Sequence, residues 1–176
     1  MQTVELTVEL KIPDVTALTA ASALRRRLGY GDVLMELHRA DYYRLSLAAD
    51  SEQQALELAE EPAENTNLFV NPNKHRYQVA AGVHNAATVA GDGVWTVKVL
   101  VSAPESGAGE AILSALQGRL GYRDQVSAVV AGDLWTLVLQ ADSKEQAEAI
   151  AQEIAVTESR GEGLLLNPHY QEYEMW

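Results

Sequence analysis

The fold is decided by residues 23–55, ALRRRLGYGDVLMELHRADYYRLSLAADSEQQA, because this stretch recurs once along the chain. Residues 115–147, ALQGRLGYRDQVSAVVAGDLWTLVLQADSKEQA, are identical to it at 15 of 33 positions without a gap. Unrelated segments of ordinary composition would share only a few positions. Asn71-Pro72 also returns, as Asn167-Pro168, after four extra residues in the second copy. The sequence therefore predicts two copies of one unit of about 80 residues.

The copies are expected at residues 1–79 and 94–176, with a linker at 80–93 between them. The linker segment is rich in Ala and Gly and shows no apolar period, which is typical of a connecting segment. The alternative interpretation is an extra surface element that packs on one of the copies.

Within each copy the apolar residues alternate, then recur every three to four positions, then alternate again. The alternation at residues 4–10 and 97–101 predicts a first strand. The apolar stripe over residues 17–28, repeated over 109–120, predicts an amphipathic helix. Gly29 and Gly121 follow the stripes, and a glycine there can end a helix in the left-handed conformation.

The second part of each copy is expected to contain two strands, a helix and a last strand. Polar residues at His38–Asp41, and Gly132-Asp133 in the second copy, predict a hairpin between the two strands. Ser51-x-x-Gln54 and Ser143-x-x-Gln146 predict capping boxes that open the second helix. Pro62 predicts that this helix stops or kinks early in the first copy.

Each copy thus has the order β-α-β-β-α-β, which is the ferredoxin-like order. The predicted fold class is α+β, with two tandem ferredoxin-like units packed as a pseudo-dimer. An antiparallel sheet with both helices on one face leaves a partly apolar face that the other copy could cover. An exposed edge strand in each copy leaves a homodimer of the fused chain open.

The composition limits which binding partners and which cellular compartment we expect. The 176 residues include 13 Lys and Arg against 25 Asp and Glu, a formal net charge of −12. Such a chain repels phosphate backbones and anionic lipid, so we expect neither nucleic acid nor a membrane as direct partner. There is no cysteine, hence no disulfide and no thiolate metal site. No apolar run approaches the ~20 residues that cross a bilayer and no secretory pattern opens the chain, so we expect a cytoplasmic protein.

No residue pattern typical of catalysis or metal binding is found. His38, His75, His84 and His169 lack the spacing of metal ligands, so we expect surface histidines with solvent or local hydrogen bonds. The Gly-rich stretch Ser106–Gly109 precedes a helix but lacks the lysine of a phosphate-binding loop. The residues alone therefore predict a binding or assembly module that has no active site of its own and uses no cofactor or metal.

The order and spacing of the short motifs, found twice, resemble those of the PurS family, the small subunit of phosphoribosylformylglycinamidine synthase. The motifs are a helix ending in L-G-Y (28–30 and 120–122), A-D-S before the second helix (49–51 and 141–143) and a closing L-x-x-N-P (68–72 and 164–168). The resemblance covers nearly the whole chain except the linker. Members of the family are normally single units of about 80 residues, so this chain resembles a tandem-duplicated form.

The resemblance implies an accessory subunit without catalytic residues. Such a subunit dimerises and bridges a large ATP-dependent synthetase subunit and a glutamine amidotransferase subunit. Ammonia released from glutamine then reaches the synthetase site, where formylglycinamide ribonucleotide becomes the amidine in de novo purine biosynthesis. A fused pair could supply in one chain what two ordinary subunits supply as a dimer.

Five residues are candidates for partner binding. Arg39, Asp41 and Asp133 lie at the expected hairpin tips, and Asn71 and Asn167 open the closing turns. The family tends to carry an Arg followed by a Gly-Lys turn between its middle strands. This chain keeps Arg39 but continues with an alanine and Asp41, and the second copy keeps only the glycine before Asp133.

Two other functions fit the same fold class. One is a small-molecule-sensing regulatory module, which needs a ligand site between the two units. The other is a cofactor-free enzyme with a cavity between sheet and helices, which needs a buried His or Asp on the sheet.

Overall fold

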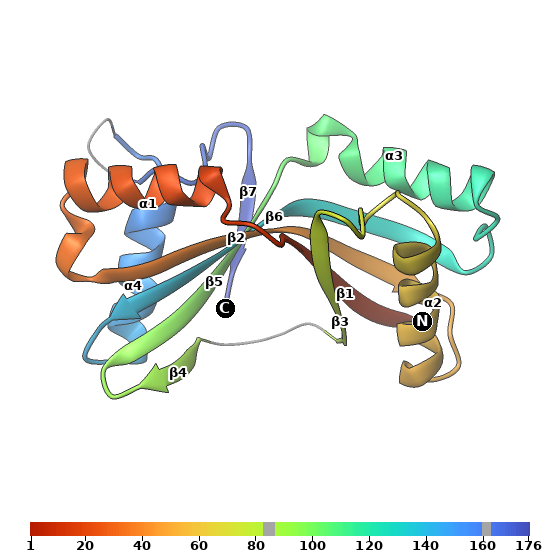
Figure 1. Cartoon of the computed structure of the whole chain (residues 1–176), viewed down its shortest axis with the longest axis horizontal. Coiled ribbons are helices and arrows are strands. Elements are labelled where there is room, and N and C mark those ends of the chain that lie inside the picture. Colours follow the sequence, from red (N-terminus) through yellow and green to blue (C-terminus); the bar gives the residue numbers. More distant parts are fainter. Residues whose placement is uncertain (83–86, 160–162) are drawn as a thin grey trace. The chain divides into compact units, whose positions relative to one another are not determined.

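The computed structural model describes residues 1–82, 87–159 and 163–176. They form a mixed α and β fold with an open antiparallel sheet (Figure 1). The strands are β1 (Gln2–Leu10), β2 (Leu34–Leu47), β3 (His75–Ala81), β4 (Thr88–Gly91), β5 (Val94–Ser102), β6 (Val126–Gln140) and β7 (Glu172–Met175). The helices are α1 (Val15–Arg27), α2 (Glu52–Asn65), α3 (Ala108–Ser114), which continues as a π-helical segment (Ala115–Arg119), and α4 (Lys144–Ala155).

The middle of each copy is one long strand. β2 has 14 residues and runs through His38–Asp41, and β6 has 15 residues and runs through Gly132-Asp133. The two predicted hairpins are therefore wrong. Ala40 is buried within the strand, and Asp41 pairs with Val8 of β1, so these residues continue a ladder instead of turning.

The chain forms two compact units, and each takes segments from both sequence copies. The first unit consists of Met1–Ile12, Ala40–Val83 and Ala103–Gly132, and the second of Pro13–Arg39, His84–Ser102 and Asp133–Trp176. Because β2 and β6 do not turn, each strand contributes its two ends to different units. The first helix of each copy is thereby packed with strands of the other copy. The boundaries 1–79 and 94–176 describe the sequence repeat, and the compact units do not follow them.

The first unit has the strand order β3-β1-β2-β6. Leu6 of β1 pairs with Tyr43 of β2 on one side and with Val79 of β3 on the other. Helix α2 lies against β1 and β3 (Figure 1), and α3 comes from the second copy. The core contains buried residues from both copies: Val4, Leu6, Val8, Leu45, Leu47, Ala55, Ala59, Ala63, Phe69, Leu116 and Val126.

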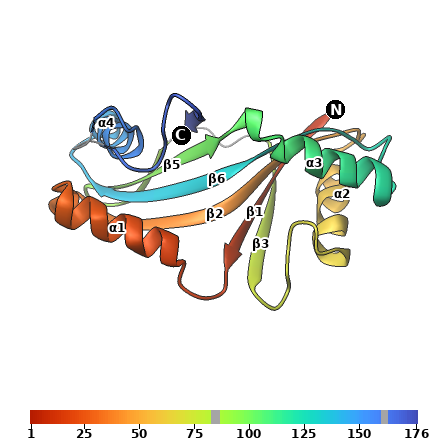
Figure 2. The same ribbon diagram turned by 90° about the horizontal axis from the view of Figure 1, so that it is seen from above.

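The second unit has the strand order β2-β6-β5, and both β4 and β7 pair with the outer edge of β5. Helix α1, from the first copy, lies alongside β2 (Figure 2), and α4 packs against β5. Arg25 ties α1 to β2 by donating from Nε to the carbonyl oxygen of Leu34 at 2.9 Å. The core again mixes the copies: Ala17, Ala21, Leu24, Leu34, Val97, Val99, Val101, Leu137, Leu139, Ala147, Ala151 and Ile154.

The pairing of β2 with β6 occurs in each unit. In the first unit the N–H of Ala48 donates to the carbonyl oxygen of Gln125 at 2.8 Å. In the second unit the N–H of Gln140 donates to the carbonyl oxygen of Val33, also at 2.8 Å. The same two strands are thus hydrogen-bonded to each other in both units.

The tyrosine of each L-G-Y motif also bonds to the other copy. The hydroxyl of Tyr30 donates to Glu153 Oε1 at 2.9 Å within the second unit. Tyr122 hydrogen-bonds to Glu61 within the first unit, and its pKa is raised by burial and by the Glu61 charge. Tyr30 and Tyr122 are equivalent in the repeat, as are Glu61 and Glu153. Each copy therefore pairs its tyrosine with the glutamate of the other copy, so the exchange of packing elements between the copies is reciprocal.

The predicted helix ends are confirmed in both copies. The Oγ atoms of Ser51 and Ser143 accept the N–H of Gln54 and Gln146, each at 3.2 Å. Each glutamine side chain accepts the N–H of the residue before the serine, at 2.7 and 2.6 Å. The glycines of the two L-G-Y motifs both have φ of 84°, the left-handed conformation that lets a helix end there.

Two other predictions from the sequence differ from the structure. Helix α2 runs through Pro62 to Asn65, so the predicted early stop is wrong, and the buried Pro62 lies beside the buried Ala59 and Ala63. The expected linker at 80–93 contains the end of β3 and strand β4, although residues 83–86 lie outside the described part. For residues 88–91 the alternative interpretation, an added element on one copy, fits the structure.

Helix α3 lies close to β6 at Gly109. A Cβ atom on Gly109 would overlap the carbonyl oxygen of Val129. We therefore expect Gly109→Ala to lower the free energy of unfolding by about 1–3 kcal/mol, because α3 must move away from the sheet. Urea unfolding followed by circular dichroism measures the loss.

Gly118→Ala is the matched control, since the added methyl group would have no atom within 4 Å apart from its chain neighbours and its own helix backbone. It should leave the stability unchanged or raise it by up to about 1 kcal/mol through helix propensity. Equal losses in the two variants would contradict the close packing of α3 on β6.

Candidate functional site

Arg39 lies within strand β2 and bridges two carboxylates of the second unit. Its Nη1 donates to Asp14 Oδ2 at 3.3 Å, and its Nη2 donates to Asp133 Oδ1 at 2.6 Å. The exposed fractions of the side chains are 25% for Arg39, 14% for Asp14 and 42% for Asp133. Two of the five candidate residues, Arg39 and Asp133, are thus brought together, and Arg39 is held by its own unit.

Asp14 also caps the first helix. Its Oδ1 accepts the N–H of Thr16 at 2.7 Å and that of Ala17 at 3.3 Å. Burial alone raises the pKa of Asp14, but these two N–H groups and Arg39 outweigh burial and lower the pKa below its usual value. The Arg39 bridge therefore joins the beginning of α1 to strand β6. Asp14 was not among the predicted site residues, although an Asp before a helical stripe is a typical N-cap signal.

Asp41 occupies the position of the first unit that Asp133 occupies in the second. The residues equivalent to Asp14 and Arg39 are there Ser106 and Ala131, neither of which carries a charge. Among the described residues the Arg39 bridge thus belongs to the second unit, and Asp41 follows Arg39 by two positions in strand β2.

Asn71 and Asn167 build the same turn in the two units. The Oδ1 of each accepts the N–H of the residue two positions on, at 3.0 Å in both turns. The carbonyl oxygen of Asn71 accepts the N–H groups of Lys74 and His75, at 2.9 and 2.8 Å. That of Asn167 accepts the N–H groups of Tyr170 and Gln171, at 3.1 and 3.0 Å. Their own N–H groups bond to His75 Nδ1 at 3.1 Å and to Gln171 Oε1 at 2.8 Å. The two asparagines therefore hold the turns that lead into the last strands.

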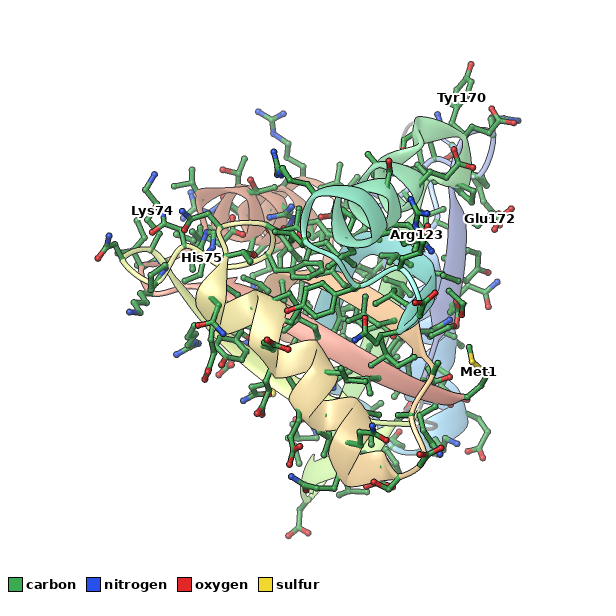
Figure 3. The ribbon with its side chains drawn as sticks, turned by 90° about the vertical axis from the view of Figure 1, so that its right-hand side faces the viewer. Met1, Lys74, His75, Arg123, Tyr170 and Glu172 are labelled. Carbon is green, nitrogen blue, oxygen red and sulfur yellow. The ribbon has the colours of Figure 1, made fainter. Side chains whose placement is uncertain are left out.

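The tips of these turns carry different side chains. The first turn presents Lys74 and His75, and the second presents Tyr170, which points outward (Figure 3). The ring of His169 lies edge-on to the ring of Tyr170, with 6.5 Å between the ring centres. Sequence comparison of the copies could have found this difference, because Lys74 and Tyr170 are equivalent positions.

The described histidines have local partners, as expected. His38 Nε2 lies 2.8 Å from Glu36 Oε2, His75 Nδ1 accepts the N–H of Asn71, and the ring of His169 lies edge-on to that of Tyr170. His84 lies outside the described residues. Within residues 1–82, 87–159 and 163–176, no three His, Asp or Glu side chains are grouped to hold a metal ion. No helix in those ranges is long and apolar enough to span a membrane.

The Arg39 bridge should contribute measurably to stability. We expect Arg39→Ala to lower the free energy of unfolding by about 1 kcal/mol, because Asp14 and Asp133 then lose a charged donor. Thermal or urea unfolding measures the change.

Arg76→Ala is the matched control for the loss of an arginine ion pair. Arg76 Nη2 lies 2.6 Å from Glu9 Oε2, but the side chains are 71% and 43% exposed, so we expect a loss near zero. If Arg39→Ala were no more destabilising than Arg76→Ala, the bridge would not hold α1 in place.

The comparisons with known proteins bear on the second copy. Residues 97–175 match the family model PurS, described as phosphoribosylformylglycinamidine (FGAM) synthase. No curated protein and no solved structure matches the chain. The matched segment begins within β5 and ends with β7. Residues 97–175 are therefore similar to the PurS family, which confirms the resemblance for the second copy.

Proposed function

We propose that the chain is a non-catalytic assembly subunit of FGAM synthase. It bridges the synthetase and glutamine amidotransferase subunits, so that ammonia passes from one to the other in de novo purine biosynthesis. The observation that carries this proposal is the PurS match over residues 97–175. PurS membership implies a part in FGAM synthase and an association with its other subunits.

The first copy is proposed to have the same ancestry, which makes the chain a tandem-duplicated PurS. Three features of local geometry support this: the Ser–Gln helix caps, the left-handed glycines and the Asn-Pro turns occur in both copies with nearly the same hydrogen bonds. Such agreement in detail goes beyond what two copies of a general α+β fold require.

Each compact unit is proposed to be a ferredoxin-like module completed by exchange. The first unit contains β1, then α3 and the first part of β6 from the other copy, then the second part of β2, α2 and β3. Taken in that order they give β-α-β-β-α-β. On this proposal the chain imitates a dimer of single PurS subunits that exchange a helix and a strand.

The five candidate residues remain proposals for partner contact. Arg39, Asn71 and Asn167 are engaged within their own units, so they would position neighbouring groups for a partner. Asp133 is 42% exposed and could meet a partner directly, and Asp41 is its equivalent in the first unit.

The test is the rate of FGAM formation by purified synthetase and amidotransferase, with and without this chain. The ammonia source is either glutamine or free ammonia. We expect the chain to raise the glutamine-dependent rate from background towards the rate given by ammonia, and to leave the ammonia-dependent rate unchanged. A bridging subunit has this effect because free ammonia does not need to be transferred between subunits.

The control is the same pair of subunits with a denatured sample of the chain. A chain that changes neither rate and forms no complex on size-exclusion chromatography would contradict the proposed function.

A further inference from the structure

Strand β3 forms an open edge of the first unit. It stands at the end of the strand order β3-β1-β2-β6, and within the described residues it pairs with β1 alone (Figure 2). Its ladder with β1 is continuous from His75 to Ala81, and the strand contains no proline. Such an edge presents a row of backbone N–H and C=O groups with which another strand can pair.

The hydrogen bonds of the ladder show which residues of β3 face outward. The N–H of Lys11 donates to the carbonyl oxygen of Lys74 at 2.8 Å. Hydrogen-bonded pairs alternate along an antiparallel ladder, so every second residue after Lys74, including Gln78, also bonds to β1. The backbone groups of Tyr77 and Val79 therefore point away from β1. Within the described residues these groups have no hydrogen-bond partner.

The outer strands of the second unit are short or irregular by comparison. β4 has four exposed residues, and its ladder with β5 shifts register between Val89 and Gly91. β7, the equivalent of β3 in the repeat, also has four residues. Short strands and bulges are two of the means by which proteins protect a sheet edge from pairing. In the part of the chain that the structure describes, the long and regular edge strand thus belongs to the first unit.

The sequence of β3 is suited to antiparallel pairing with the same strand of a second copy. With Gln78 opposite Gln78 of the second copy, all seven residues of the strand overlap. The outward backbone groups of Tyr77 then meet those of Val79 of the second copy, and an aromatic residue opposite a β-branched one is a favourable cross-strand pair. Arg76 falls opposite Ala80 of the second copy, so this register opposes no like charges.

We propose that two copies of this chain associate through β3, in antiparallel pairing with Gln78 at the twofold axis. Each β3 has one open side, so the contact closes at two copies and does not propagate. A strand of another protein could use the same backbone groups, but the match of Tyr77 with Val79 favours a second copy. The inference goes beyond the proposed function and does not depend on it, because it needs only the chain itself.

The experiment is analytical ultracentrifugation of the full chain over a range of concentrations, for the wild type and for Gln78→Lys and Gln78→Glu. We expect a monomer–dimer equilibrium for the wild type. Each variant places like charges opposite each other at the axis, so its dimer dissociation constant should rise roughly three- to tenfold. An equal mixture of the two variants should recover the wild-type affinity, because lysine then faces glutamate.

Gln152→Lys is the matched control, since Gln152 is an exposed glutamine on α4 in the second unit. It changes the net charge of −12 by the same amount as Gln78→Lys, yet it should leave the dimer unchanged. Gln78 is also exposed. At concentrations where the wild type is monomeric, all variants should therefore melt within about 2 °C of it by circular dichroism.

The outcomes are separate from those of the FGAM synthase assay. A chain that stays monomeric at every concentration overturns the inference and leaves the proposed function standing. A dimer that the two Gln78 variants weaken no more than Gln152→Lys does also overturns it, because such a dimer forms at another surface. Recovery in the mixture of Gln78→Lys and Gln78→Glu supports the inference even if the chain has no effect on FGAM formation.

Discussion

The structure depends on two strands that do not turn. β2 and β6 run through the polar residues where a hairpin would close each copy, and they pair with each other in both units. Once these strands are extended, the helix that precedes each of them is carried to the strands of the other copy. The hydrophobic core of each unit is then built from both copies, so neither copy can bury its apolar residues alone. The covalent duplication places both sets of elements in one chain.

This exchange also explains why the two units are similar without being equal. The helix caps, the left-handed glycines and the Asn-Pro turns are repeated, because each solves a local backbone problem that both copies share. The Arg39 bridge and the added strand β4 are found in the second unit, and Tyr170 replaces a lysine there. In a duplicated chain each unit needs to keep only the features that its own packing and contacts require. The partner-facing features can therefore differ between the copies while the fold is kept.

Much of the local structure could be predicted from the sequence, because it is fixed by neighbouring residues. Ser51 and Ser143 begin helices, and Gly29 ends one, whatever the rest of the chain does. The hairpins could not be predicted in this way. Gly132-Asp133 suits a turn but also tolerates an extended strand. Whether the chain turns or stays extended there depends on which copy the preceding helix packs against. Since the two copies present nearly the same apolar pattern, the sequence favours neither pairing. The Arg39–Asp14 contact was missed for the same reason, as it depends on the path of β2.

The exchange of elements is tested most directly by double-mutant cycles on the two tyrosine–glutamate pairs. Each cycle combines Tyr→Phe with Glu→Gln and measures the free energy of unfolding. The account predicts a coupling of roughly 0.5–1.5 kcal/mol for Tyr30 with Glu153 and for Tyr122 with Glu61. It predicts no coupling for the pairs within one copy, Tyr30 with Glu61 and Tyr122 with Glu153. Coupling in the pairs within one copy, with none between the copies, would contradict the account.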